Sequence, residues 1–276
     1  MRAASVAIIV STALLLMALE RRFPYAHQKT FRPGFFDDLV LYTVVQSWVM
    51  GQVIAWLIAR IDGATSLSRL HLVSTWPVWA QLAFFFVVHD FYIYWFHRLQ
   101  HHSPVLWRIH EAHHSTRDVD WLSGSRSHML EILVNQTIEF APIVLLGAAP
   151  EVAILKGTLD AVWGMWIHSN VDVRTGALQK VINGPEMHRW HHAIEIREGG
   201  INFGTKLSVW DWVFGTAHLP TEKPRGYGLV DARYPDGWLR QHLYAFRKSE
   251  ERRPEQASAR EVSRPSSVIS HQCERP

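Results

Sequence analysis

The sequence predicts an all-α protein with several membrane-spanning helices. Two features of its composition predict this fold class. Hydrophobic residues make up 48% of the chain and charged residues only 19%, a balance that suits a membrane protein better than an average soluble domain. Long apolar segments with few charges also recur through the first two thirds of the chain. A third feature concerns histidine, since twelve of the seventeen lie between His89 and His192.

The first two apolar segments predict spanning helices. Ala3 to Leu19 is uncharged for 17 residues, which is just long enough to cross a bilayer. A signal peptide is the alternative for so short a run, but no clear cleavage site appears and further apolar segments follow. Leu39 to Ala59 is uncharged for 21 residues and ends at Arg60, which makes it the strongest candidate span.

A third apolar segment runs from Thr75 to Phe96 and is interrupted only by His89 and Asp90. Lysine and arginine are concentrated in the loop between the first two spans. The positive-inside rule therefore puts that loop in the cytoplasm. The third span then returns to the cytoplasm and brings His97 and His101 to that side.

Two weaker segments, Ile132 to Ala149 and Val152 to Ile167, predict a helical hairpin that enters the membrane and returns. Pro150-Glu151 between them is a turn signal. The hairpin ends at His168, on the same side as His97. Because charges that face lipid are costly, we expect its charged side chains to face the protein interior; they are Glu139, Lys156 and Asp160.

Three histidine clusters have the spacing at which a helix directs several imidazoles to one point. Residues i, i+3 and i+4 share a helix face, and neutral imidazole is a strong ligand for transition metals. The first cluster is H-x3-H and the other two are H-x2-H-H. We expect these eight residues to be metal ligands: His97, His101, His110, His113, His114, His188, His191 and His192.

Turn signals separate the helices that carry the clusters. The third apolar segment should continue as a helix through His97 and His101, and Ser103-Pro104 should end it. The second cluster would then lie on the next helix. Asn183-Gly184-Pro185 predicts the start of the helix that carries the third cluster.

The number of ligands predicts two metal ions. A structural zinc takes four ligands and a catalytic zinc usually three, so eight imidazoles are too many for one ion. His168, at the end of the hairpin, is a ninth candidate. Asp90, His128 and Glu131 are candidates to orient ligand imidazoles, although a hydrogen bond within the helix or an ion pair is an equal alternative for Asp90. The roles of His89 and His102 stay open.

The chemistry of the site is less defined than its ligands. Imidazole suits zinc, copper, nickel and iron. An all-histidine site against a bilayer suits redox chemistry on a lipid, in which two irons reduce O2 to an oxidant that attacks an unactivated C–H bond. Two alternatives remain: a histidine-rich membrane metal carrier without redox catalysis, and a dizinc hydrolase. The hydrolase needs a general base, and Glu111 is the acidic residue within a cluster.

Composition excludes other classes. The formal net charge is only +3 and no basic stripe with interleaved aromatics occurs, so we expect no nucleic-acid partner. Cys273 is the single cysteine, which rules out a disulfide within the chain or a cysteine-based metal site. The segment Lys248 to Pro276 is polar and lacks aromatics, which predicts a disordered tail.

The histidine pattern resembles that of the fatty acid hydroxylase/sterol desaturase superfamily of integral-membrane non-haem di-iron enzymes. The resemblance covers roughly residues 80 to 220. Met129 departs from it, because proline is common at that position. Besides the clusters, these stretches carry it: Asp90 to Arg98, His113-His114-Ser115, the Arg126/His128/Glu131 stretch, His168-Ser169-Asn170, Asn202-Phe203-Gly204 and Trp210 to Thr216.

The resemblance implies about four membrane helices, partly as hairpins, with a cytosolic helical cap that holds two iron ions, for which zinc is a possible substitute. It implies O2-dependent hydroxylation or desaturation of a lipid, with electrons from an external donor such as ferredoxin or cytochrome b5 with its reductase. Asn170 joins the candidates to support the ligands. We expect residues 1–75 to form N-terminal membrane helices, 76–247 the catalytic domain and 248–276 the tail. Short loops favour a bacterial inner membrane, with the endoplasmic reticulum as the alternative.

Overall fold

Helices form the regular structure of the described part of the chain. The computed structural model describes residues 1–196, 200–231 and 233–247, and β-pairing within them is limited to isolated bridges. The all-α prediction is therefore confirmed for these residues. Met1–Ala245 pack as one compact unit. The predicted tail, residues 248–276 with Cys273, lies outside the described residues.

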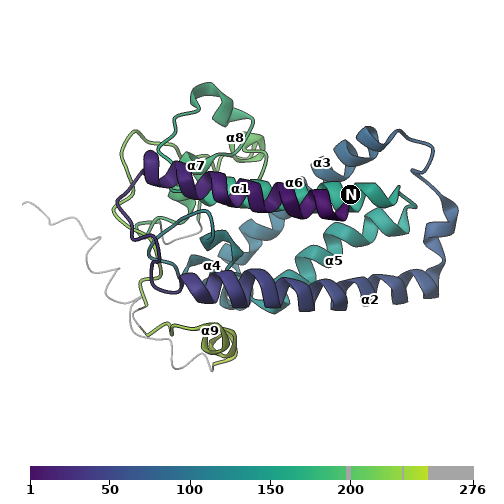
Figure 1. Ribbon diagram of the computed structural model, residues 1–276, viewed down its shortest axis with the longest axis horizontal. Coiled ribbons are helices and arrows are strands. Elements are labelled where there is room, and N and C mark those ends of the chain that lie inside the picture. Colours follow the sequence, from purple (N-terminus) through teal and green to yellow (C-terminus); the bar gives the residue numbers. More distant parts are fainter. Residues whose placement is uncertain (197–199, 232, 248–276) are drawn as a thin grey trace, which may run out of the picture. The chain divides into compact units, whose positions relative to one another are not determined.

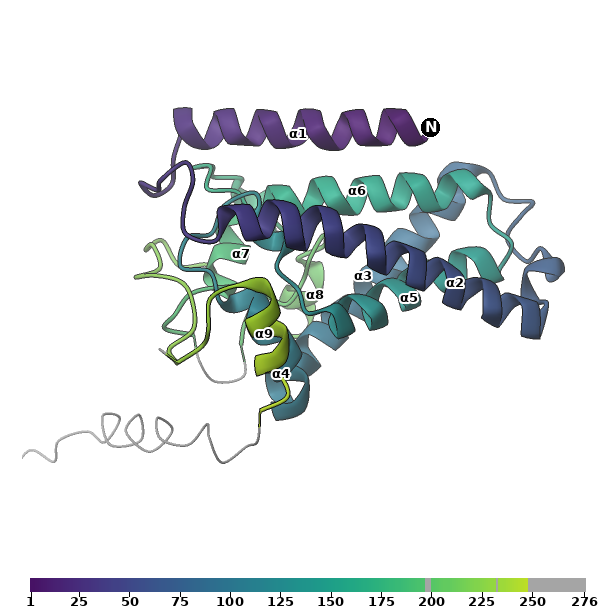
Figure 2. The same ribbon diagram turned by 60° about the horizontal axis from the view of Figure 1, so that its bottom comes forward.

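Five long helices form the body of the compact unit. α1 packs along α6, and α2 packs along α5, and both views show these pairs side by side (Figures 1 and 2). A π-helical segment, η1, runs directly into α2. The bounds are α1 Arg2–Arg22, η1 Asp37–Gln46, α2 Ser47–Thr65, α3 Val78–His102, α5 Met129–Leu145 and α6 Pro150–His168.

The shorter helices gather at one end of the long ones, where α3 and α6 end (Figures 1 and 2). This end carries the histidine clusters, because α4 and α7 follow α3 and α6 in the chain. The short α-helices are α4 Pro104–His114, α7 Pro185–His191, α8 Val209–Val213 and α9 Trp238–Tyr244, and the 3-10 turns are η2 Leu67–Leu70, η3 Ser123–Ser125 and η4 Gly176–Lys180.

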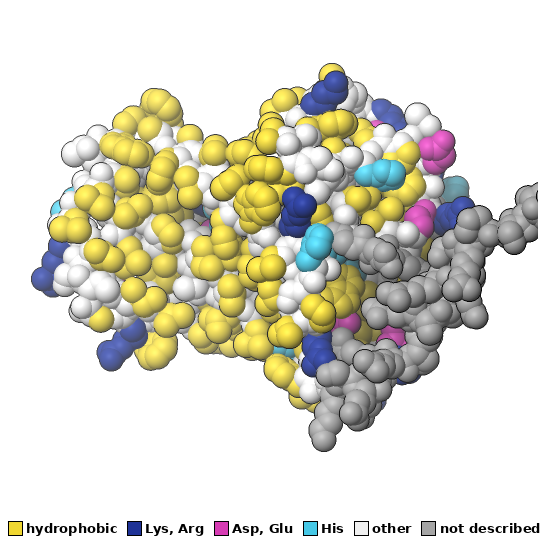
Figure 3. All heavy atoms as spheres, turned by 180° about the vertical axis from the view of Figure 1, so that it is seen from behind, with side chains coloured by type: hydrophobic (Ala, Val, Ile, Leu, Met, Phe, Trp, Pro, Cys, Tyr) yellow, Lys and Arg dark blue, Asp and Glu magenta, His cyan; other side chains and the backbone are white. Residues whose placement is uncertain are grey.

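Two helical stretches of the described residues are long and apolar enough to cross a membrane, Arg2–Arg22 and Asp37–Thr65. They contain the first two predicted spans. Their large apolar side chains are exposed, as at Trp48 and Trp56, and a face dominated by hydrophobic side chains is visible in Figure 3. Such a surface needs lipid or protein to cover it. A count of four spans stays a prediction.

Helix ends follow the turn signals, with one correction. The break at Ser103-Pro104 is confirmed: the Ser103 hydroxyl accepts a hydrogen bond from the Leu106 amide, and Pro104, which lacks an N–H, opens α4. The turn predicted at Pro150-Glu151 is wrong, because Pro150 occupies the first turn of α6. The connection from α5 instead turns at Gly147, whose φ of +72° favours glycine.

The charges of the hairpin face the protein interior, as predicted. Lys156 is fully buried and its ammonium lies 2.6 Å from a Glu139 carboxylate oxygen. It also pairs with Asp160 one helical turn later. The two acids thus share a buried cation and need no contact with lipid.

A second buried ionic network joins the start of η1 to the loops beside the histidines. Asp38 lies 2.7 Å from the Arg32 guanidinium and 2.5 Å from that of Arg126. Arg32 also forms a bidentate ion pair with Asp120, with both N···O distances at 2.8 Å. Such geometry is needed for buried ions to compensate their lost hydration.

We predict that Asp38→Asn destabilises the fold by about 3–5 kcal/mol, because Arg126 and Arg32 would each lose a buried charged partner. Thermal unfolding of the detergent-solubilised protein measures the effect. Asp37→Asn is the matched control, since Asp37 is the partly exposed neighbour on the same segment. Equal melting temperatures for the two variants would contradict this account of the network.

Candidate metal centre

The structure brings all nine predicted histidine ligands together, in two groups. In each group, one ring nitrogen from every member lies within 4.8 Å of those of the others. His168 from the hairpin is included. The first group is His97, His101, His110, His114 and His191, and the second is His113, His168, His188 and His192.

Each H-x2-H-H cluster contributes to both groups. His110 and His114 belong to the first group, whereas His113 between them belongs to the second. His188 and His192 belong to the second group, and His191 to the first. Residues at i+3 and i+4 differ by roughly 100° around a helix axis, so one helix can face two adjacent points.

Hydrogen bonds to the Nδ1 atoms fix the orientation of five rings. Nδ1 of His110 lies 2.8 Å from a Glu131 carboxylate oxygen. Four others donate to main-chain carbonyls. These pairs are His97 with Phe203 at 2.9 Å, His113 with Arg126 at 3.0 Å, His168 with Gly164 at 2.7 Å and His191 with Ile201 at 2.7 Å.

These bonds determine where the ring protons are. A carbonyl or carboxylate oxygen only accepts, so the neutral ring must carry its proton on Nδ1 and a bare lone pair on Nε2. Two such lone pairs face each other 3.1 Å apart between His97 and His110, and 3.3 Å apart between His113 and His168. This arrangement is repulsive unless a cation lies among the nitrogens. A transition-metal ion in each group would relieve it.

Burial keeps these imidazoles neutral. The lost hydration lowers the pKa of His113 to about 4 and that of His110 to about 3. Burial also lowers the pKa values of His188 and His192 well below 6.5, and neighbouring histidines lower them further. Neutral rings are the form that binds metal.

Two ring nitrogens that have no hydrogen-bond partner in the described chain also fit a metal. They are Nε2 of His101 and Nε2 of His191, both buried. A buried polar atom without a partner is costly and rare in a folded protein. For His191, Nδ1 is already bonded to Ile201, so the unpartnered Nε2 is the free ligand atom. The donor set therefore suits metals that favour nitrogen.

Of the four residues expected to support the ligands, Glu131 contacts one directly. Its Oε1 receives hydrogen bonds from His110 and, at 2.9 Å, from the Gln100 amide. Asn170 instead stabilises the loop after α1. Its side-chain oxygen accepts a hydrogen bond from the Ala26 amide, and its side-chain nitrogen donates one to the Ala26 carbonyl. His128 caps α5 by accepting from the Leu130 amide.

Asp90 holds a loop instead of an imidazole. Its carboxylate accepts hydrogen bonds from the Lys206 and Leu207 amides, the Thr205 hydroxyl and the Trp210 indole. Asp211 holds the same loop by accepting from the amides of Phe203 and Gly204. The Phe203 carbonyl accepts a hydrogen bond from Nδ1 of His97. Both aspartates therefore act on the site through that loop.

The two unassigned histidines lie outside the two groups. His89 lies with Glu139 and Asp160, which could together hold a metal. The Lys156 ammonium, however, is 3.2 Å from His89 Nδ1 and pairs with both acids, so it supplies the positive charge there. His102 is exposed, and its Nδ1 bonds to the Arg98 carbonyl at the end of α3.

Main-chain carbonyls are the supporting groups that sequence analysis missed. The carbonyls of Phe203, Arg126, Gly164 and Ile201 orient four of the rings. No residue type marks such a role. Asp211 lies within the stretch Trp210 to Thr216, and its role in accepting two backbone hydrogen bonds is visible only in the structure.

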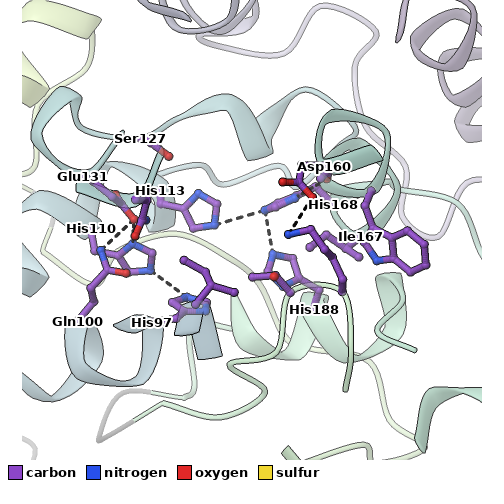
Figure 4. A pocket seen from close by; sticks show the side chains of 16 residues that line it. His97, Gln100, His110, His113, Ser127, Glu131, Asp160, Ile167, His168 and His188 are labelled. Carbon is purple, nitrogen blue, oxygen red and sulfur yellow. Dashed lines mark hydrogen bonds and ion pairs between the residues drawn. The ribbon is translucent and has the colours of Figure 1, made fainter. Parts of the chain in front are cut away.

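A cavity of about 180 Å³ lies against both groups and between α3, α5 and α6. Figure 4 shows the rings of His97, His110, His113, His168 and His188 along it, with Glu131 behind His110 and Asp160 at the opposite end. The site therefore has room for a substrate segment next to the imidazoles.

Comparison with known proteins identifies the family. The fatty acid hydroxylase family model matches residues 82–216, a range that contains all nine histidines. Ornithine lipid hydroxylase OlsE of Rhizobium tropici is 31% identical over 246 residues, which cover 87% of this chain and 74% of that protein. The chain belongs to the fatty acid hydroxylase/sterol desaturase superfamily.

Other proteins similar to this chain are named for different reactions within the superfamily. Human alkylglycerol monooxygenase is 29% identical over 223 residues, which cover 71% of this chain but only 49% of that protein. The Delta(7)-sterol 5(6)-desaturase erg3C of Aspergillus fumigatus is 24% identical over 237 residues, covering 76% of this chain and 72% of that protein. No solved structure matches this chain.

We predict that Gly124→Ala disrupts the second group of histidines. A Cβ at this position would lie 2.5 Å from Nδ1 of His168, so the ring must move. Bound transition metal, measured by plasma mass spectrometry, should fall from about two ions per chain to about one. Gly51→Ala is the control, because a Cβ there meets nothing within 4 Å. Unchanged metal content in Gly124→Ala would count against His168 as a ligand.

Proposed function

We propose that this protein is a membrane-bound di-iron oxygenase that uses O2 to hydroxylate a C–H bond of a lipid. The balanced reaction is R–H + O2 + 2 electrons + 2 protons → R–OH + H2O, with the electrons from an external carrier such as ferredoxin or cytochrome b5 with its reductase. The observation that carries the proposal is the pair of buried imidazole groups whose bare Nε2 atoms face one another.

The composition of the site supports iron over the hydrolytic alternative. The nine nitrogens divide into five and four, and no carboxylate belongs to either group among the described residues. A hydrolytic dizinc centre usually has bridging carboxylates, and none is placed to bridge here. The relatives that are named as hydroxylases, monooxygenases and a desaturase act on lipids by their printed names, which also favours oxidation.

The residues of this chain hold and shield the metals. The first group would bind one iron and the second group the other, and bound iron supplies the O2 activation that no side chain can provide. Glu131 and the four carbonyls keep five of the nine rings in the tautomer that presents Nε2. Burial of the rings excludes water from the site, which limits loss of the oxidant to solvent.

The proposal includes a membrane arrangement. We propose that α1 and the η1–α2 stretch span the bilayer, that α3 and the α5–α6 hairpin complete a platform of about four spans, and that α4, α7 and α8 form a cap on the cytoplasmic side. The exposed apolar faces of the long helices and the position of the short helices at one end support this. A bacterial inner membrane is the proposed location.

A desaturase is the second candidate, because one relative is a sterol desaturase. Both reactions begin by removing a hydrogen atom, and they differ in whether oxygen is then inserted or a second hydrogen is lost. The histidine ligands are compatible with either reaction. A metal carrier is disfavoured because its ligands should follow a path across the spans, whereas these converge at one end.

Purification under anaerobic conditions, followed by iron analysis and O2 uptake upon reduction, tests the proposal. We predict about two irons per chain, O2 consumption that requires a reductant, and lipid products heavier by one oxygen atom. His188→Ala should lose iron and activity, because His188 lies 2.8 Å from His168 and 3.1 Å from His192 within the second group.

His102→Ala is the matched control, since its imidazole is exposed and outside both groups. It should retain iron and activity. Wild-type protein that binds zinc but no iron, and shows no O2 uptake with any reductant, would overturn the proposal. Products lighter by two hydrogens would assign the desaturase reaction instead.

A further inference from the structure

Arg189 lies on α7 between two of the candidate ligands, His188 and His191, and its side chain is buried. It is only 1% exposed, and its guanidinium forms no ion pair with a carboxylate of the described residues. Nε and Nη2 of the guanidinium have no hydrogen-bond partner in this part of the chain either. A buried cation without a counter-ion is strongly destabilising unless other contacts compensate it. The contacts that Arg189 does make therefore indicate its role.

The guanidinium binds the backbone that directly follows His168. Nη1 of Arg189 donates to the carbonyl of Ser169 at 3.2 Å and to that of Val171 at 3.0 Å. Because one donor atom is charged, both hydrogen bonds are stronger than those between neutral groups. A single side chain of α7 thus holds the end of α6, and with it the candidate ligand His168, close to the helix that carries His188.

Tyr25, in the loop after α1, packs on the same guanidinium. Cζ of Arg189 lies 3.6 Å from the centre of the Tyr25 ring, a cation–π contact that is stronger when the cation is buried. The Tyr25 amide donates to the Asn170 carbonyl at 2.8 Å. A β-bridge between Pro24 and Val171 continues this pairing. Arg189 therefore joins three parts of the chain: α7, the segment after α6 and the loop after α1.

The His188 ring lacks the hydrogen bond that orients other rings of the second group. Its Nδ1 is buried and has no partner in the described chain, whereas Nδ1 of His113 and that of His168 donate to carbonyls. Nε2 of His188 lies 2.8 Å from Nε2 of His168, a contact that is visible in Figure 4. The position of the His188 ring therefore depends on where the backbone of α7 lies relative to the end of α6, and Arg189 connects the two.

Other contacts hold α7 through segments that do not belong to α6. Glu186 accepts a hydrogen bond from the Gln179 side chain at 2.6 Å. The Met187 carbonyl accepts one from the Asn202 side chain at 2.8 Å. These contacts remain when Arg189 is replaced. A replacement should therefore change the spacing of the two rings without unfolding the helix.

We infer that Arg189 is a positioning residue of the second group: it sets the spacing of His168 and His188, and through that spacing the metal affinity of the group. The inference rests on the metal centre of the proposed function and gives the buried, unpaired cation a role in it. Contacts that orient metal ligands from outside change metal affinity about tenfold to a hundredfold when they are removed. His191, on the same helix, should be unaffected, because the Ile201 carbonyl holds its Nδ1 separately.

The test titrates Co²⁺ into the metal-free, full-length protein in detergent and follows visible absorption. The two groups differ in ligand number, so Co²⁺ should give a different spectrum in each, and Gly124→Ala identifies the spectrum of the second group. We expect Arg189→Met to weaken Co²⁺ binding to the second group about tenfold to a hundredfold, and to leave the affinity of the first group unchanged. Arg189→Lys, which keeps the charge and can donate to one carbonyl, should lie between Arg189→Met and the wild type.

Tyr25 provides an independent measurement. Tyr25→Leu removes the ring face and should weaken the second group about threefold, whereas Tyr25→Phe keeps the face and should bind as the wild type does. The double variant Tyr25→Leu/Arg189→Met should bind no more weakly than Arg189→Met, because the ring acts through the guanidinium. Additive effects of the two substitutions would contradict the inference.

Arg174→Met is the matched control, because the Arg174 side chain is 55% exposed and pairs with Glu186 at the other end of α7. It should bind Co²⁺ as the wild type does. Wild-type affinity of the second group in both Arg189 variants would overturn the inference, and so would equal weakening of both groups together with a lower melting temperature. If Arg189→Met does not fold, Arg189→Lys decides. Wild-type protein that binds no transition metal would overturn the proposed function, and the inference with it.

Discussion

The rest of the structure depends on the close approach of bare imidazole nitrogens. Main-chain carbonyls and Glu131 place the ring protons on Nδ1, so lone pairs face one another at 3.1 Å between His97 and His110 and at 3.3 Å between His113 and His168. Such contacts require a cation, and burial of the rings removes water as a substitute. The short helices, the two ionic networks and the loop held by Asp90 and Asp211 all keep these nitrogens in place.

The supporting contacts reach far along the chain. Asp38, at the start of a candidate span, bonds Arg126, and the Arg126 carbonyl holds His113. Asp90, within α3, accepts a hydrogen bond from the loop that contains Phe203, and the Phe203 carbonyl accepts a hydrogen bond from His97. Changes at these positions would therefore reach the metal centre through the backbone. This coupling explains how helices with exposed apolar faces and a buried polar centre form one compact unit.

The ligand candidates could be predicted from sequence because helical spacing alone brings H-x3-H and H-x2-H-H residues to one face. His168 followed from the predicted return of the hairpin. Two metal ions were predicted from the number of ligands. The assignment of each histidine to one of the two groups was not, although residues at i+3 and i+4 point about 100° apart around a helix axis. The roles of Asp90, Asn170 and His128 were not foreseen either, since each depends on contacts with loops distant in sequence. Carbonyl partners such as Gly164 carry no sequence signal at all.

We propose that the groups of five and four imidazoles each hold one iron. Mössbauer spectroscopy of protein loaded anaerobically with iron-57 tests this most directly. Because the groups differ in the number of ligands, the reduced protein should show two high-spin ferrous doublets of equal area, at about two irons per chain. One doublet at one iron per chain, or loss of both doublets in His102→Ala but not in His188→Ala, would contradict it.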